Sequence, residues 1–373
     1  MTLPLFHRLA LCAALSCCTA EALAVDDTPA PVPSFAEAGL YLIREGDLVG
    51  LIDRQGKTVL APEFEELKYG DGLVLARKGY RTAYFDPAGT MVLKPQDRAT
   101  APFSEGLVAV PNGKGLGYAN KSLDIAIAGP YARAEPFHGG LAAVAMPDDW
   151  GVPKFGYIDK TGKVVVAAKY DKAGPFVDGV ARVEVEKRPR LIDRSGRDIT
   201  PPGVDFVGIT RDGMTRVWIG RGQGFVDAKG NVAVPIDWEG AREFSDGLAS
   251  VYKDRKYGFV DKTGRVVIAP RFEQAESFSD GLALVRDEAG PAYIDKTGRI
   301  AIRPDAERAF AFSDGRAAIV KDKKYGFIDR AGKIVVPATY SYARPFEKGL
   351  AFVLDKGRAM FIDDRGNVVW SKP

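Results

Sequence analysis

The chain has 373 residues, with 52 basic and 49 acidic side chains and a formal net charge of +3 at neutral pH. This near balance gives no argument for a nucleic-acid partner, which normally needs a strongly basic face. Three cysteines (Cys12, Cys17 and Cys18) and two histidines (His7 and His138) occur. We therefore expect no disulfide framework, no His/Cys zinc site, no cysteine nucleophile and no cofactor.

The first 24 residues have the pattern of a secretory signal peptide. Arg8 precedes an apolar run, Leu9–Ala20, that is too short to span a membrane, and Ala22-Leu23-Ala24 fits a small-x-small cleavage site. Removal of this segment would leave one histidine and no cysteine. We expect an exported protein, periplasmic or extracellular, with no transmembrane span in its mature chain. Cys17 and Cys18 leave a lipoprotein anchor open, although their spacing from Leu15 is unusual for one.

Residues 25–34 form a Pro-rich spacer, and residues 35–373 form an array of ten similar units. Most units are 34 residues long, and a fixed period of this size is the signature of a repeat architecture. An acidic or amide residue marks one turn in each unit. These residues are Asp53, Asp86, Asn120, Asp159, Asp193, Asp227, Asp261, Asp295, Asp329 and Asp363.

Two aromatic positions recur with this turn. The residue two places before it is Tyr or Phe in eight units, with Leu51 and Leu191 in the other two. The residue seventeen places after it is Phe in seven units, for example Phe278 and Phe312. A position that is aromatic once per unit indicates a stacked column, because each unit can cover its apolar face only with the next unit.

The repeated pattern is similar to that of the WG-repeat family of bacterial proteins, also called KWG repeats. The segments Lys256–Asp261 and Lys324–Asp329 are the closest matches, and the similarity covers roughly residues 35–372. The family's Trp is replaced here by Tyr, Phe, Leu or Gln. The resemblance implies extracytoplasmic or interaction modules, and it does not imply one biochemical activity.

Each unit predicts three short β-strands. In the unit that starts at Gly247, they are Gly247–Val251, Tyr257–Asp261 and Arg265–Ala269, followed by a polar return segment. The fold class is therefore all-β. Two architectures fit. We favour an elongated, twisted β-solenoid or superhelical array, which has no limit on unit number. A closed β-propeller remains the alternative, because the return segment could supply the fourth strand of a blade.

One unit is five residues longer than the others. The extra residues lie within Met146–Lys154, between its first two strands, and place Trp150 beside Asp148 and Asp149 on a loop stiffened by prolines. Irregular loops on rigid scaffolds often carry binding residues, and Trp is enriched among binding hot spots. We predict that Trp150, Asp148, Asp149 and Lys154 form a binding site, although Trp150 could instead cover a neighbouring aromatic column.

Other candidate sites have simpler structural interpretations. The turn acids could bind calcium, but Asp-x-x-Gly supplies one carboxylate per turn, and turn stabilisation is the better explanation. His138 occupies a return-segment position where other units have Ser, which indicates a turn residue. No Ser/His/Asp set can be assembled around it, and the adjacent acids Asp148-Asp149 and Asp363-Asp364 point in opposite directions in an extended chain.

These observations favour a non-enzymatic exported protein that serves as a protein- or glycan-binding scaffold in the bacterial cell envelope. Two alternatives remain open. One is an enzyme acting on envelope polysaccharide, with acids in the irregular middle units. The other is a structural assembly factor without a small ligand.

Overall fold

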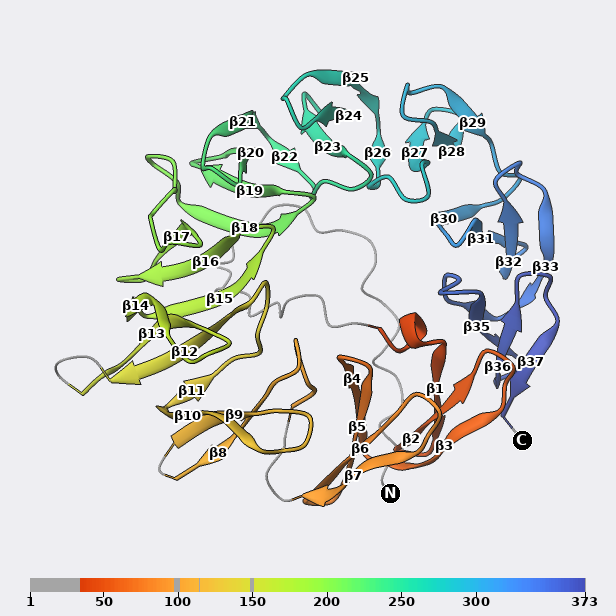
Figure 1. Ribbon diagram of the computed structural model, residues 1–373. Coiled ribbons are helices and arrows are strands. Elements are labelled where there is room, and N and C mark those ends of the chain that lie inside the picture. Colours follow the sequence, from red (N-terminus) through yellow and green to blue (C-terminus); the bar gives the residue numbers. More distant parts are fainter. Residues whose placement is uncertain (1–33, 97–100, 114, 148–150, 373) are drawn as a thin grey trace, which may run out of the picture.

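The computed structural model describes residues 34–96, 101–113, 115–147 and 151–372. These residues form ten antiparallel sheets arranged as the blades of a closed ring (Figure 1). The expectation of an all-β repeat protein is confirmed. The expected open solenoid is wrong, because blade 10 lies beside blade 1 and the ring closes. The alternative, a propeller, is correct.

Seven of the ten sheets have four strands in the described residues. Their strands are, in blade 2, β4 (Glu66–Gly70), β5 (Leu73–Lys78), β6 (Arg81–Phe85) and β7 (Met91–Gln96); in blade 4, β11 (Arg133–Ala134), β12 (Leu141–Pro147), β13 (Pro153–Asp159) and β14 (Val164–Tyr170); in blade 6, β18 (Phe206–Arg211), β19 (Met214–Ile219), β20 (Gly222–Asp227) and β21 (Val232–Trp238); in blade 7, β22 (Gly240–Ala241), β23 (Leu248–Lys253), β24 (Lys256–Asp261) and β25 (Val266–Phe272); in blade 8, β26 (Gln274–Ala275), β27 (Ala283–Asp287), β28 (Gly290–Ile294) and β29 (Ile300–Ile302); in blade 9, β30 (Arg308–Ser313), β31 (Arg316–Lys321), β32 (Lys324–Asp329) and β33 (Ile334–Tyr340); and in blade 10, β34 (Tyr342–Ala343), β35 (Leu350–Asp355), β36 (Arg358–Asp363) and β37 (Val368–Ser371).

Three sheets have three strands. They are, in blade 1, β1 (Leu40–Glu45), β2 (Leu48–Asp53) and β3 (Thr58–Phe64); in blade 3, β8 (Val108–Asn112), β9 (Gly115–Ala119) and β10 (Ile125–Tyr131); and in blade 5, β15 (Lys172–Val177), β16 (Val180–Val185) and β17 (Arg188–Asp193). A single 3₁₀-helix, η1 (Phe35–Ala38), precedes β1.

The sequence repeat and the blade are offset by one strand. The unit that starts at Gly247 supplies β23, β24 and β25 of blade 7, and its return segment supplies β26, which pairs with β27 of blade 8. The innermost strand of a four-stranded blade thus comes from the preceding repeat. It faces the central opening, while the last strand of each blade, such as β25, β29 or β33, lies at the rim (Figure 1). The offset also explains why blade 1, at the start of the array, has three strands here.

Local sequence features shape each blade. Tyr257 pairs with Phe272 and Phe259 with Ile268, so the segment around Pro270 bulges opposite Gly258. A bulge can accommodate Pro because the residue there does not have to donate an N–H to the strand ladder. A Cβ at Gly258 would lie 2.5 Å from the carbonyl oxygen of Ile268. This close approach explains the Gly that recurs in the second strand.

The two predicted aromatic positions meet between blades. The residue before the turn and the Phe of the next blade form fully buried ring pairs, with ring centroids 4.7–4.9 Å apart and mostly edge-to-face geometry. These pairs are Tyr84–Phe103, Tyr118–Phe137, Tyr157–Phe176, Phe225–Phe244, Phe259–Phe278, Tyr293–Phe312 and Phe327–Phe346. Edge-to-face pairs add to the free energy gained from burying the ring area. The prediction of repeated interfaces that stack on aromatic rings is confirmed.

Hydrogen bonds reinforce these interfaces. Where the first aromatic is Tyr, its hydroxyl donates to a backbone carbonyl of the next blade, as from Tyr118 to Glu135 at 2.7 Å. The Ser of the Ser-Asp-Gly loop donates to the carbonyl of the next Phe, as from Ser279 to Phe312 at 2.7 Å. The carboxylate of the loop Asp accepts a hydrogen bond from the backbone N–H of the Gly in the next blade's Ser-Asp-Gly loop. Asp280, for example, accepts from Gly315 at 2.7 Å. Buried polar groups need such partners.

The ring closes through side chains rather than through a shared sheet. The Tyr41 hydroxyl of blade 1 donates to the Lys348 carbonyl of blade 10 at 2.7 Å, and the Tyr41 and Phe361 rings are 5.6 Å apart. A Cβ at Gly56 would lie 2.2 Å from the carbonyl oxygen of Val369. Gly264 makes the same kind of approach to Ala233 at 2.5 Å between blades 7 and 6. The closing seam therefore repeats the backbone packing of an interior seam.

Phe259→Ala and Phe327→Ala should each reduce the free energy of unfolding by about 3–5 kcal/mol, because each deletes a packed ring from the core. The loss should spread to the adjoining blades, since units in a repeat protein stabilise their neighbours. Chemical denaturation measures this effect. The control is Val266→Ala, because this side chain is 45% exposed and should change stability by about 0.5 kcal/mol or less. Equal stability of the Phe259 and Val266 variants would contradict the role of the ring pairs.

Candidate functional site

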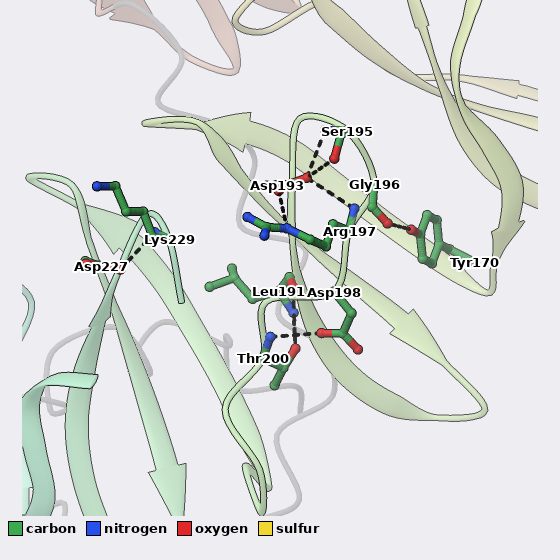
Figure 2. A network of polar contacts seen from close by, with 10 residues as sticks. All are labelled: Tyr170, Leu191, Asp193, Ser195, Gly196, Arg197, Asp198, Thr200, Asp227 and Lys229. Carbon is green, nitrogen blue, oxygen red and sulfur yellow. Dashed lines mark hydrogen bonds and ion pairs between the residues drawn. The ribbon is translucent and has the colours of Figure 1, made fainter. Parts of the chain in front are cut away.

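The turn carboxylates bind backbone groups. The Asp193 Oδ1 atom accepts hydrogen bonds from the backbone N–H groups of Ser195 at 2.9 Å and Arg197 at 3.1 Å, and from the Ser195 hydroxyl at 2.6 Å (Figure 2). The Arg197 guanidinium donates to Oδ2 at 2.9 Å. Burial alone would raise the pKa of Asp193, but these donors hold it at about 2. The carboxylate thus stabilises its own turn.

The same arrangement recurs in the other units. Asn120 keeps it without a charge, because its Oδ1 accepts from Ser122 at 2.9 Å and from Asp124 at 3.1 Å. Across the part of the chain that the structure describes, no group of three or more His, Cys, Asp or Glu side chains could hold a metal ion. The geometry therefore agrees with turn stabilisation and gives no support to calcium binding.

Asp261→Asn should change stability little at neutral pH, since Asn120 fills the same role. In the native protein the Thr263 hydroxyl and the Thr263 and Arg265 backbone N–H groups lower the pKa of Asp261 to about 2 from 3.8. Because the folded-state pKa is lowered, this contribution is present above pH 3.8 and is lost as the pH falls through 2. The Asn variant should lack that acid-dependent loss.

Asp261→Ala should instead lose about 1 kcal/mol at neutral pH, because two backbone N–H groups lose their acceptor. Urea denaturation at pH 7 and pH 3 measures both variants. If Asn and Ala lose the same stability at pH 7, the acceptor role of Asp261 is wrong.

The long unit extends its hairpin. Pro147 pairs with Pro153 at the end of β12 and β13, which are seven residues each. The Lys154 ammonium forms an ion pair with Asp171 at 2.5 Å, and Asp171 also accepts the Glu186 backbone N–H at 2.6 Å. The loop end of this hairpin is thus tied to blade 5. The other predicted binding residues, Asp148, Asp149 and Trp150, lie outside the described residues.

His138 is a turn residue, as expected. Its backbone N–H donates to the Leu141 carbonyl at 2.8 Å, and it takes the place of the Ser in the Ser-Asp-Gly loops. Burial lowers the pKa of His138, while the nearby Glu105 carboxylate opposes this shift. The side chain is therefore held toward its neutral form.

An aromatic cluster lies at the seam of blades 9 and 10, and we call it the inner aromatic cluster because two of its three residues are on innermost strands. We define it as Phe310 on β30, Tyr325 on β32 and Tyr342 on β34. The Phe310 and Tyr325 rings are stacked, with centroids 5.9 Å apart and planes at 24°, and Tyr325 is 5.8 Å from Tyr342. Tyr342 is 40% exposed. Arg308, whose guanidinium carbon lies 5.4 Å from the Phe310 ring, adds positive charge beside the cluster.

Blade 6 presents a second aromatic pair with an arginine. Phe206 on the innermost strand β18 packs edge-to-face on Trp218, with centroids 4.7 Å apart. The Arg216 guanidinium lies 4.5 Å from the Trp218 ring and forms an ion pair with Glu243 at 2.8 Å. Burial lowers the pKa of Arg216. Half-buried aromatic rings beside guanidinium groups therefore occur at two places, each at a seam between blades.

Glu276 follows the innermost strand β26, and its carboxyl group has a raised pKa. Desolvation raises this pKa, and the Arg242 guanidinium of blade 7 partly opposes the shift. A glycoside hydrolase would need such an acid together with a second carboxylate about 5–10 Å away. Arg242 is the charged neighbour that acts on the pKa of Glu276.

The repeat pattern does not indicate the inner aromatic cluster. Phe310 and Tyr342 stand at return-segment positions where the other units differ. In blade 8, for example, Gln274 and Glu276 start the corresponding segment. A search for aromatic residues at such variable positions would have found the cluster.

The fold defines this protein as a repeat β-propeller of ten blades. The chain belongs to the family of WG containing repeat proteins, because the family model matches residues 50–81, 155–188, 224–257, 257–288, 292–325 and 325–358, more than half of the sequence. The resemblance seen in the sequence is confirmed. No curated protein matches the chain in sequence.

Solved structures with a similar arrangement include a eukaryotic initiation factor, with 10% identity over 90% of this chain and 96% of that chain and a TM-score of 0.49. Hsv2 from Kluyveromyces lactis is 12% identical over 65% of this chain and 97% of its own, with a TM-score of 0.33. The extracellular domain of a putative hybrid two-component system from B. thetaiotaomicron is 10% identical, over 90% and 64%, with a TM-score of 0.25. Similarities this low say nothing about what this chain binds.

The expected signal peptide and spacer, residues 1–24 and 25–34, lie outside the described residues except for Ser34. From Ser34 onward, no described helix has the length and hydropathy that a membrane span requires.

Proposed function

We propose that this protein is a non-enzymatic, exported scaffold that binds a glycan or protein of the bacterial cell envelope on the inner side of its ring. The observation that carries this proposal is the inner aromatic cluster. Tyr342 remains 40% exposed although it contacts other rings, which leaves an aromatic surface available to a partner. Aromatic and Arg side chains are enriched among residues that dominate binding energy.

The chemistry of the cluster favours an acidic glycan over a protein partner. Flat aromatic rings pack against the apolar faces of sugar rings, and guanidinium groups form paired hydrogen bonds with carboxylates. Arg308 lies beside the Phe310 ring of the cluster and is exposed. Arg344, two residues after Tyr342, is also exposed and lies over the Phe352 ring of the same blade. The predicted loop at Met146–Lys154 would supply a further contact surface on blade 4.

A non-enzymatic role is supported by the environment of Glu276. Burial raises its pKa, which suits a general acid, but the charged neighbour that acts on it is the Arg242 guanidinium, which opposes that rise. Glycoside hydrolysis by the usual routes needs two carboxyl groups in defined positions. Binding therefore explains the inner surface with fewer additional requirements than catalysis.

Tyr342→Ala should weaken binding of the partner by about 2 kcal/mol or more, roughly 30-fold, with little change in melting temperature. The partner is first identified with the chain from residue 25 onward, by pull-down from an envelope extract and by screening a glycan array. Affinities are then measured by calorimetry. The control is Tyr80→Ala, since Tyr80 is 99% exposed on the hairpin tip of blade 2. Equal affinities of the two variants would remove the inner cluster from the binding site.

Export gives a separate prediction. The periplasmic or secreted protein should begin at Val25, because cleavage is expected after Ala24. N-terminal sequencing of protein purified from each cell fraction measures this. A protein that stays in the cytoplasm and begins at Met1 would refute export, without affecting the binding test.

A further inference from the structure

An open pocket lies on the outer rim between blades 7 and 8, away from the inner aromatic cluster. Its volume is about 610 Å³, within the range of ordinary small-molecule sites. Arg271 and Phe272, at the end of β25, form one wall. Arg299 and Ile300, at the start of β29, form the other, and Asp287 at the end of β27 completes it.

The pocket carries a net positive charge, because one of its arginines has no carboxylate partner. Asp287 is bound by both terminal nitrogens of Arg303, at 3.1 and 2.5 Å, which neutralises its carboxylate. The Nε atom of Arg299 donates to the Asp295 carboxylate at 3.2 Å. Arg271 instead donates to an uncharged group, the carbonyl of Gly298. Among the described residues, no carboxylate forms an ion pair with Arg271, so the pocket keeps one uncompensated guanidinium.

The Arg271 side chain is also held in place. Its guanidinium carbon lies 4.9 Å from the centroid of the Phe272 ring, and its Nη2 atom is fixed by the Gly298 carbonyl. A planar guanidinium held on an aromatic ring loses little conformational entropy when it binds an anion. Its remaining N–H groups suit a carboxylate or phosphate, because both accept paired hydrogen bonds.

The corresponding seam between blades 4 and 5 is built differently. There Tyr170 stands at the position of Phe272, and its hydroxyl donates to the Gly196 carbonyl at 3.3 Å (Figure 2). The tyrosine thus fills the role that Arg271 has at the seam of blades 7 and 8. Loss of that hydroxyl at Phe272 gives the guanidinium access to the carbonyl and leaves a cation in the pocket.

We propose that this pocket binds a small organic anion, a carboxylate or a phosphate monoester, through the Arg271 guanidinium. Ile300, which is 46% exposed, provides an apolar wall for the carbon skeleton of the ligand. Thus the rim pocket is a small-molecule site, separate from the surface proposed for the envelope partner.

The test uses the chain from residue 25 onward and isothermal titration calorimetry at low ionic strength, with glucuronate, glucose 6-phosphate and uncharged glucose as probes. The wild type should bind at least one of the two anions and should not bind glucose. The anion that binds more tightly identifies the carboxylate or the phosphate as the preferred group. Arg271→Ala should weaken that binding at least tenfold.

Arg265→Ala is the matched control. Arg265 occupies the turn position in blade 7 that Arg299 occupies in blade 8, and its Nε atom donates to Asp261 at 3.0 Å, but it does not line the pocket. Its removal should leave anion binding unchanged. Phe272→Tyr is a second variant, expected to reduce binding because its hydroxyl would compete for the Gly298 carbonyl, as Tyr170 bonds to Gly196.

Three results would overturn the proposal. The wild type could bind neither anion, Arg271→Ala could bind as the wild type does, or Arg265→Ala could lose as much affinity as Arg271→Ala, which would indicate non-specific charge attraction. Melting temperatures are recorded for every variant. If Arg271→Ala fails to fold, the Phe272→Tyr result decides, and unchanged binding there would refute the assigned geometry.

Discussion

The edge-to-face contact between two aromatic rings of neighbouring blades is the interaction on which the ring depends. Phe259 and Phe278, with centroids 4.9 Å apart, represent the seven ring pairs, six of which are edge-to-face. One ring comes from the second-last strand of a blade and the other from the return segment that enters the next blade. The contact therefore fixes the distance between blades and also places the innermost strand. Because both rings are fully buried, each blade is stable only beside its neighbour.

Seams that lack this pair are joined by other contacts. Between blades 5 and 6, Leu191 replaces the first ring, and the Arg182 guanidinium donates to the Val207 carbonyl at 3.2 Å. Asp178 also accepts the Gly213 backbone N–H at 2.9 Å across that seam. The closing seam uses the Tyr41 hydroxyl and the Tyr41 ring, which lies 5.6 Å from the Phe361 ring of blade 10. The repeat thus tolerates sequence changes where another contact joins the blades.

Because a shared set of residues holds the blades together, residues on other surfaces can differ between units. The turn acids are bonded within their own turns, and the aromatic pairs and the Ser-Asp-Gly loops join neighbouring blades, so these groups offer little to a ligand. Residues that differ between units, such as Tyr342 on the inner side and Arg271 on the rim, contribute little to that common framework. Binding surfaces on repeat proteins arise in this way, because the scaffold is supplied by the shared positions and specificity by the others.

The sequence by itself determined the all-β class, the ten units, the aromatic interfaces and the role of the turn acids. Each of these depends on contacts within one unit or between adjacent units, and such contacts repeat with the period of the sequence. Closure was decided by the tertiary structure, because it depends on the small rotation between blades summed over the whole ring. Gly56 and Val369 resemble the residues of any interior seam. The inner aromatic cluster and the rim pocket also required the fold, since Phe310, Tyr325 and Tyr342, like Arg271 and Arg299, meet only when adjacent strands and blades are packed.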